Sequence, residues 1–176
     1  GDTHNTPVEL TENRFPMLVT SHALIPDSCG AGRNRGGLGI EYEVKALSPF
    51  NLTTRGERAH CRPWGLEGGL EAHGNNVGLL MDGKWRDDLQ NAKVFAVNLK
   101  EGDAYRMRSG GGGGFGPPYE RSVEKVVSDV RQGYISAASA ATDYGVIIDP
   151  ETQEADIPAT ERARADLKSS AVKATG

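Results

Sequence analysis

Two arginines stand between glycines in the segment GAGRNRGGLG, residues 30–39. Arginine carries a planar fork of donors that suits a carboxylate or a phosphate, and glycine lets a ligand approach the backbone closely. Arg33 and Arg35 are therefore candidates for binding a carboxylate or phosphate ligand. The structural alternative is a glycine-bulged entry to a strand, in which one arginine pairs with a carboxylate such as Glu41 or Glu43. The residues alone leave both interpretations open.

A second glycine cluster lies in SGGGGGFGPPYE, residues 109–120. Successive backbone N–H groups in such a loop can bind a phosphate, but a Walker A loop ends in Gly-Lys-Ser/Thr. This cluster ends in Phe115-Gly116-Pro117-Pro118, and proline has no N–H to donate. The composition favours a close-packed backbone crossing where no Cβ fits. The candidate loop glycines are Gly30, Gly32, Gly36, Gly37, Gly112, Gly113 and Gly114.

Metal-ligating and nucleophilic residue types are sparse. Asp2, His4 and Glu9 lie near the start, but a metal site needs three or four converging ligands and the neighbourhood supplies no convincing set. We therefore predict no metal ligands in this chain. Cys29 and Cys61 are too few for a disulfide scaffold and are expected to be free thiols, as in a cytoplasmic protein. No histidine can be assigned to Cys29 as a base, so no catalytic residue is identified.

Charge and hydropathy exclude several classes of function. The chain has 176 residues and a net charge of −4, which argues against electrostatic binding to nucleic acid or anionic lipid. No apolar run approaches the roughly 20 residues that span a bilayer. The chain begins with Gly1 rather than Met, which we interpret as a cut or a subunit boundary.

The segments that must position these residues fall into two parts. Residues 1–109 contain β-rich runs at 17–25, 37–47, 75–85 and 93–108, separated by turn signals. In the second run Ile40, Tyr42 and Val44 alternate with charged residues, which is typical of a strand with one buried face. We expect a β-rich unit, sandwich- or barrel-like, over these residues.

Helices are expected after the glycine- and proline-rich loop at 110–120. An apolar stripe with helical spacing predicts a first helix, with Ser122 as its N-cap and Gly133 just beyond its end: Val123, Val126, Val127 and Val130. A second, alanine-rich helix starts at Ser136 and stops near Gly145, and a third covers about 160–168. The fold class is therefore α+β: a β-rich first two-thirds, then two or three short helices in a unit, 121–168, packed on it. The tail, 169–176, is expected to fray.

Several stretches taken in order resemble the carboxy-terminal part of the hydantoinase B/oxoprolinase family. They are NTPVELTENRFPMLV (5–19), PDSCGAGRNRGGLGI (26–40), PWGLEGG (63–69), GGGGGFGPPYERSVEKVVSDVRQGYIS (110–136) and ATDYGVIID (141–149). The resemblance covers almost the whole chain, and its most specific part is the pairing of the two glycine-rich segments. In one position the chain departs from the family, since Cys29-Gly30 replaces the usual Gly-Gly. A cysteine there would be strained if the turn requires a positive φ.

The resemblance implies a function in a larger enzyme. In this family a partner A-type subunit binds ATP and phosphorylates a carbonyl or enolate oxygen of a small-molecule substrate. The B-type subunit then handles the activated species, by hydrolysis of a cyclic amide (a hydantoin, lactam or 5-oxoproline) or by carboxylation of a ketone. The expected partners are that A-type subunit and the remaining amino-terminal part of the B-type subunit. The complex would use ATP with Mg and a divalent metal, Zn or Mn, held by parts absent from this chain.

Within that family role, the substrate contacts we expect are Asn5, Thr6, Arg33 and Arg35. The chain alone is not expected to be active. One alternative is a part of an acetone-type ATP-dependent ketone carboxylase. Another is a non-catalytic assembly module, in which the stripe from Val123 to Val130 would pack against a partner chain.

Overall fold

The computed structural model describes residues 6–174, and their contacts divide the chain into two compact units that interleave in sequence. The first unit contains residues up to 23, 40–60 and 75–109. The second contains residues 24–39, 61–74 and the chain from 110 onward. Two segments of the β-rich part of the sequence, 24–39 and 61–74, thus pack with the carboxy-terminal helices.

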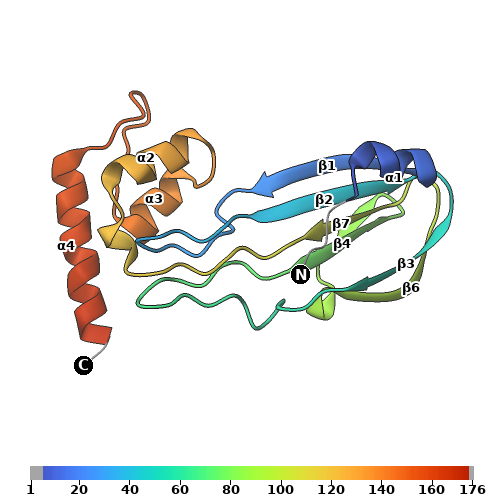
Figure 1. The fold of residues 1–176 in the computed structure, drawn as a ribbon, viewed down its shortest axis with the longest axis horizontal. Helices are drawn as coiled ribbons and strands as arrows, with labels where there is room; N and C mark the ends of the chain where they lie inside the picture. The colour runs from blue at the N-terminus through green and yellow to red at the C-terminus, as the bar shows by residue number, and fades with distance from the viewer. Residues whose placement is uncertain (1–5, 175–176) are drawn as a thin grey trace. The chain divides into compact units, whose positions relative to one another are not determined.

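The first unit is built from two sheets (Figure 1). Five strands hydrogen-bond in the order β1 (Met17–Ile25), β2 (Gly39–Ala46), β7 (Ala104–Arg108), β4 (Asn76–Met81) and β5 (Lys84–Arg86). A second, two-stranded sheet pairs β3 (Phe50–Arg55) with β6 (Lys93–Leu99) in antiparallel fashion. A short helix, α1 (Val8–Arg14), precedes β1, and a 3-10 turn, η1 (Gln90–Ala92), precedes β6.

The core of the first unit lies between its two sheets, because both contribute buried side chains to it. Tyr42, Val44 and Ala46 alternate with charged residues along β2, and Val44 and Ala46 are fully buried. The buried cluster collects residues of β2, β3, β4, β6 and the 3-10 turn η1: Ala46, Leu52, Val77, Leu79, Ala92, Val94 and Leu99. Between β4 and β5 the chain turns at Asp82 and Gly83, both with positive φ, as a two-residue hairpin requires.

The second unit carries three helices, α2 (Val123–Arg131), α3 (Ala137–Tyr144) and α4 (Ile157–Ala174), besides a 3-10 turn, η2 (Pro118–Glu120). The predicted caps are confirmed. Ser122 and Ser136 each accept a hydrogen bond from the backbone N–H three residues later, at the starts of α2 and α3. Gly133 and Gly145 adopt positive φ just past the ends of these helices. The α4 helix is longer than predicted and continues through residues 169–174.

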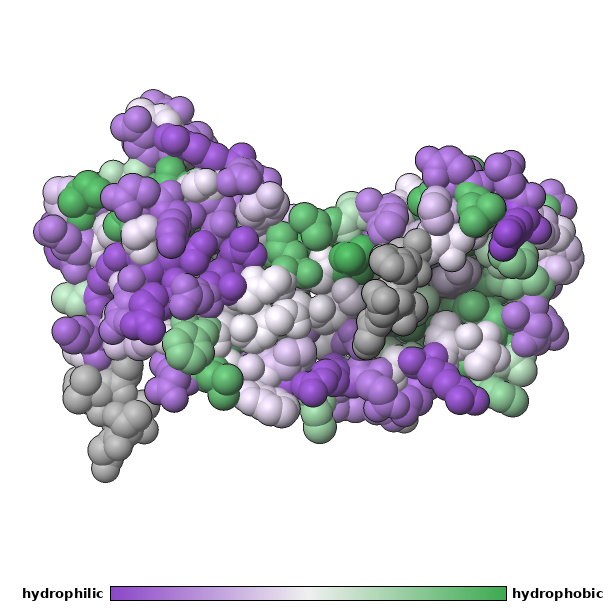
Figure 2. All heavy atoms as spheres, in the orientation of Figure 1, coloured by the Kyte–Doolittle hydropathy of each residue, from purple (hydrophilic) through white to green (hydrophobic). Residues whose placement is uncertain are grey.

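The valine stripe of α2 faces the core of its own unit. Val126 is fully buried among Ala31, Ile135 and Tyr144, and the other three valines of the stripe pack against the same cluster. The hypothesis that this stripe packs against a partner chain is therefore wrong, because the second unit buries the stripe itself. In Figure 2 the visible face of these helices is predominantly hydrophilic.

The fold class is confirmed: antiparallel strands dominate the first two-thirds of the chain and helices follow. No helix among the described residues is long and apolar enough to cross a membrane.

Candidate functional site

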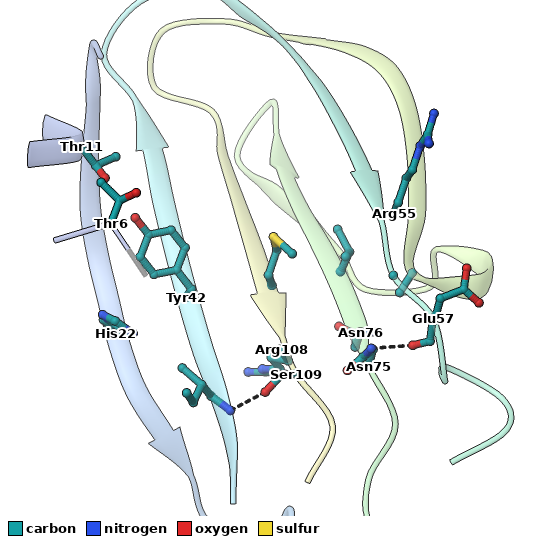
Figure 3. Close-up of a pocket in the computed structure, with 15 residues that line it drawn as sticks. Thr6, Thr11, His22, Tyr42, Arg55, Glu57, Asn75, Asn76, Arg108 and Ser109 are labelled. Atoms are coloured by element: carbon teal, nitrogen blue, oxygen red, sulfur yellow. Dashed lines mark hydrogen bonds between the residues drawn. The ribbon is translucent and has the colours of Figure 1, made fainter. Parts of the chain in front are cut away.

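A half-open pocket of about 650 Å³ lies within the first unit (Figure 3). Its walls come from β1, β2, β7 and β4 on one side, and from the end of β3 on the other. The apolar part of the wall includes Ile40, Val77 and Met107, while Arg55 and Glu57 stand on the opposite side. This volume falls within the range of small-molecule sites.

Polar side chains of several types line this pocket. His22 and Tyr42 meet edge to face, with ring centroids 5.3 Å apart. Ser109 also lines the pocket, and its hydroxyl accepts a hydrogen bond from the backbone N–H of Ile40 at 2.8 Å. Thr6, one of the predicted substrate contacts, also lines the pocket. Such a lining can hold a small polar molecule, but no described nucleophile and base are hydrogen-bonded to each other in it. Asn5, the other predicted contact near the start, lies outside the described residues.

The glycine-rich segments of the second unit pack backbone against backbone. A Cβ added at Gly36 would stand 1.8 Å from the carbonyl oxygen of Gly112, and one at Gly114 would stand 1.9 Å from that of Ala31. Hydrogen bonds join the same segments: the N–H of Gly30 donates to the Gly112 oxygen at 2.8 Å. The glycines therefore serve a contact that any side chain would block. Gly37 differs, because nothing lies within 4 Å of an added Cβ there.

Arg33 stands at the edge of this crossing with half of its side chain exposed. Its guanidinium lies 5.9 Å from the ring centroid of Phe115 and 3.3 Å from a carboxylate oxygen of Glu120. Both groups of that ion pair are solvent-exposed, so the pair contributes little to stability. The Arg33 fork is accessible to a ligand.

Arg35 is held inward instead. Its Nε donates to Asp129 of α2 at 3.2 Å, and its guanidinium lies over Tyr134 with 5.3 Å to the ring centroid. Asp129 also accepts a bond from Arg121 at 2.9 Å. Desolvation opposes the charged form of Arg35, but the hydrogen bond that Arg35 donates to Asp129 and the negative charge of Asp129 together raise the pKa of the guanidinium. Arg35 can therefore reach a ligand only at the expense of this ion pair.

The suggested carboxylate partners for these arginines, Glu41 and Glu43, are wrong. Glu41 pairs with Arg108 across β2 and β7 at 2.8 Å, and Glu43 lies 3.7 Å from Arg106. Both glutamates alternate with the core-facing residues of β2, so they point to the other face of the sheet and bond the cross-strand arginines there.

Cys29 fits its turn without strain, since its φ is not positive. The thiol packs at the edge of the second unit's core, and this burial raises its pKa although Arg35 is close by and acts in the opposite direction. A raised pKa disfavours the thiolate, so Cys29 lacks the environment of a nucleophile.

Asp129 is a residue that sequence reasoning missed. It is only 5% exposed and follows Val126 by three positions, so it lies on the core side of α2. A carboxylate next to an apolar stripe is a signal of a buried ion pair, but nothing in the spacing identifies Arg35, 94 residues away, as one of its partners. Among residues 6–174 no group of three or more His, Cys, Asp or Glu side chains could hold a metal ion.

Comparison with known proteins identifies relatives along the chain. The sequence model described as hydantoinase B/oxoprolinase matches residues 1–118. An uncharacterized protein of Methanocaldococcus jannaschii is 37% identical over 82% of this chain and 25% of its own length. Caprolactamase subunit beta of Pseudomonas jessenii is 34% identical over 90% of this chain and 28% of its own. The chain thus spans about a quarter of the length of these relatives.

Two solved structures share the fold. The ATP-dependent caprolactamase of Pseudomonas jessenii superposes with a TM-score of 0.74 at 30% identity, over 90% of this chain and 28% of that one. The nucleotide-free acetone carboxylase superposes with a TM-score of 0.78 at 22% identity, over 96% of this chain and 27% of that one. The second likeness concerns the fold alone.

Proposed function

The chain belongs to the hydantoinase B/oxoprolinase family, and from that premise we propose that it is the carboxy-terminal segment or a small subunit of a B-type subunit in an ATP-dependent enzyme. The likeness to caprolactamase carries the proposal, because both sequence and fold agree over 90% of the chain. Caprolactamase subunit beta and the acetophenone carboxylase delta subunit are named as subunits, which favours a hetero-oligomeric complex rather than activity of this chain alone. We propose a cytoplasmic location for this complex.

The proposed reaction is the opening of a cyclic amide such as a hydantoin, a lactam or 5-oxoproline. An A-type partner subunit transfers the terminal phosphoryl group of ATP to the carbonyl oxygen of the substrate. Water then adds to the carbonyl carbon, and the C–N bond breaks as the ring nitrogen takes up a proton, which leaves an acyl phosphate. A second water hydrolyses this acyl phosphate to the carboxylate and phosphate, so that one ATP and two waters are consumed for each ring opened. The residues of this chain would shape the substrate cleft and contact the rest of the enzyme.

Metal and nucleotide would be held elsewhere in such a complex. The described residues do not fit a metal centre, because no group of suitable ligands converges among them. Mg-ATP and a divalent metal, Zn or Mn, are therefore assigned to the A-type subunit and to the amino-terminal part of the B-type subunit.

Arg33 is the residue that we propose for direct substrate contact. Its guanidinium is half exposed at a rigid backbone crossing, where it can offset negative charge that develops on a phosphorylated or tetrahedral species. Thr6 and Asn5 are further proposed contacts. Arg35 remains in the proposed site, but its engagement with Asp129 favours a supporting role.

Co-expression with an A-type subunit tests the function. We expect ATP-dependent ring opening of at least one of caprolactam, hydantoin and 5-oxoproline, measured as product and released phosphate. ATP-dependent incorporation of labelled bicarbonate into a ketone, with no ring opening, would favour the carboxylase alternative instead. A complex that turns over neither class would refute the proposal.

Arg33→Ala tests the proposed contact in that complex. Loss of one donor to a developing oxyanion costs about a hundredfold or more in kcat, and complex assembly should be unchanged. Arg62→Ala is the matched control, because Arg62 is equally exposed and pairs with an exposed glutamate, Glu71, at 3.4 Å. Turnover that is equal in the two variants would remove Arg33 from the site.

A non-catalytic assembly role is the second candidate, and one observation favours it. Trp64, Leu66 and Phe115 are 63%, 58% and 41% exposed on adjoining segments of the glycine crossing. Exposed aromatic and aliphatic residues next to an arginine are typical of protein interfaces. Size-exclusion chromatography of the isolated chain distinguishes this role: a well-behaved monomer contradicts it, whereas dependence on a partner supports it.

A further inference from the structure

We propose that Asp129, on α2, is a positioning residue for Arg33 and acts through Arg35 and Arg121. This inference rests on the role proposed for Arg33 above. Asp129 does not touch Arg33 itself. Its carboxylate instead binds two arginines, and each of them donates a hydrogen bond to the backbone of residues 33–36, which we call the Arg33 loop.

The carboxylate of Asp129 receives three hydrogen bonds from two guanidinium groups. Arg35 donates from Nε at 3.2 Å and from Nη2 at 3.4 Å, and Arg121 donates from Nη2 at 2.9 Å. The side chains are 7%, 17% and 11% exposed for Asp129, Arg35 and Arg121, so solvent screens these charges little. Two shielded cations that share one anion depend on that anion, since without it they would repel each other.

Each arginine also donates a hydrogen bond to the backbone of the Arg33 loop. Arg121 donates from Nη1 to the backbone oxygen of Arg33 at 3.3 Å, and Arg35 donates from Nη1 to that of Gly36 at 2.9 Å. The first and last residues of the loop are therefore held by two guanidinium groups, and both of these groups are paired with the Asp129 carboxylate. A planar fork can bond a carboxylate and a carbonyl at once, which a lysine ammonium does with far less directional control.

The opposite side of the loop is already fixed by backbone pairing. The N–H of Arg33 donates to the Gly116 oxygen at 3.1 Å, and Asn34 exchanges two bonds with Phe115 at 2.9 and 3.0 Å. The Arg33 side chain makes no bond to Asp129. Its guanidinium pairs with the exposed Glu120 at the surface, where a ligand can reach it, while its backbone is held from both sides. Removing Asp129 would release the backbone on the helix side.

Hydrogen exchange of the full chain tests the positioning without any enzymatic assay. Asp129→Asn keeps the shape of the side chain and removes its charge. We expect exchange of the Arg33 and Asn34 amides to accelerate at least tenfold, while amides of the β3–β6 pair keep their rates. Asp143→Asn on α3 is the matched control, because Asp143 accepts hydrogen bonds from Ser139 and Thr142 of its own helix, and this variant should leave both sets unchanged. Unchanged exchange in Asp129→Asn would overturn the proposal.

A double-mutant cycle in the assembled enzyme tests the functional consequence. Asp129→Asn should lower kcat/KM about tenfold and change the same parameter, kcat or KM, as Arg33→Ala. The double variant should be no slower than Arg33→Ala alone, because both act through one contact. Losses that multiply would show a merely structural role and overturn the inference. If Arg33→Ala leaves turnover intact, the proposed contact fails, while the exchange result still decides whether Asp129 orders the loop.

If Asp129→Asn does not fold, Arg121→Lys provides a second test of the inference. It keeps a positive charge beside Asp129 and removes the fork that reaches the Arg33 oxygen. Faster exchange confined to Arg33 and Asn34, with a non-additive loss of activity, supports the inference. Native-like exchange and turnover in this variant would contradict it.

Discussion

Gly36→Ala is the substitution that most directly tests why this chain concentrates glycine. A Cβ at residue 36 would stand 1.8 Å from the carbonyl oxygen and 2.5 Å from the carbonyl carbon of Gly112. The φ of Gly36 is not positive, so alanine is compatible with the local conformation and the only penalty is the collision. Gly37 is the matched control, since an added Cβ there meets nothing within 4 Å.

The expected cost follows from what the collision displaces. To restore ordinary contact the two backbones must separate by roughly 1.5 Å, which breaks bonds such as those from Gly30 to Gly112 at 2.8 Å and from Gly112 to Gly37 at 2.9 Å. Each buried backbone group left unpaired costs about 1–3 kcal/mol, and alanine recovers somewhat less than about 1 kcal/mol from the unfolded chain. We expect Gly36→Ala to lose about 3 kcal/mol, or roughly 6–12 °C in Tm, and Gly37→Ala to stay within about 0.5 kcal/mol.

Urea unfolding in a Trp85→Phe background provides the assay, because Trp64 then reports on the second unit alone. The readout is the difference in free energy of unfolding between Gly36→Ala and Gly37→Ala. Equal stabilities would refute the packing argument. If Gly36→Ala were instead stable and impaired only in turnover, the glycines would serve ligand approach rather than backbone packing.

Three further results are expected. Ser28→Ala should lower the free energy of unfolding by about 2 kcal/mol in denaturant, because the buried hydroxyl donates to one backbone carbonyl at 2.6 Å and accepts from one backbone N–H at 2.7 Å. A loss below about 0.5 kcal/mol, which is typical of a surface substitution, would contradict this. The hydrogen bond from Arg108 holds the pKa of Glu41 below its usual value, so the stabilisation by Glu41 is present above the unfolded pKa and is lost as pH falls through the folded pKa. The stability deficit of Glu41→Gln should therefore be clear at pH 6–7 and vanish in acid. A deficit that does not change with pH would contradict this. Alkylation at pH 7.5 should modify the exposed Cys61 well before Cys29, whose thiol pKa burial raises, and peptide mass spectrometry would expose the reverse order.

Local patterns predicted the elements of this fold well because their causes are local. The alternation along β2 depends on one strand having one buried face, and the caps at Ser122 and Gly145 depend on backbone groups within a few residues. The Asp82-Gly83 turn likewise needs only two residues that tolerate positive φ. The α1 helix was not predicted, since it has no side-chain N-cap and no buried residue to mark it.

Pairing between distant segments could not be predicted in the same way. Residues 93–108 are one β-rich run in the sequence, but they divide between two sheets, because β6 pairs with β3 while β7 pairs with β2 and β4. The carboxylate partners of Arg33 and Arg35 illustrate the same limit for the candidate site. Arg35 has Glu41 and Glu43 nearby in sequence, but pleating turns those side chains to the other face of the sheet, where cross-strand arginines take them.

By itself, the sequence determined that two glycine-rich segments pack closely, where the caps of α2 and α3 lie, and which family the chain resembles. Only the tertiary structure decided that the two glycine segments cross each other and that the valine stripe is buried within its own unit. It also decided that Asp129 pairs with both Arg35 and Arg121. The physical reason is range. Propensity and capping act over a few residues, whereas a backbone crossing or a buried ion pair is stabilised only after folding has brought segments about 80–95 residues apart into contact.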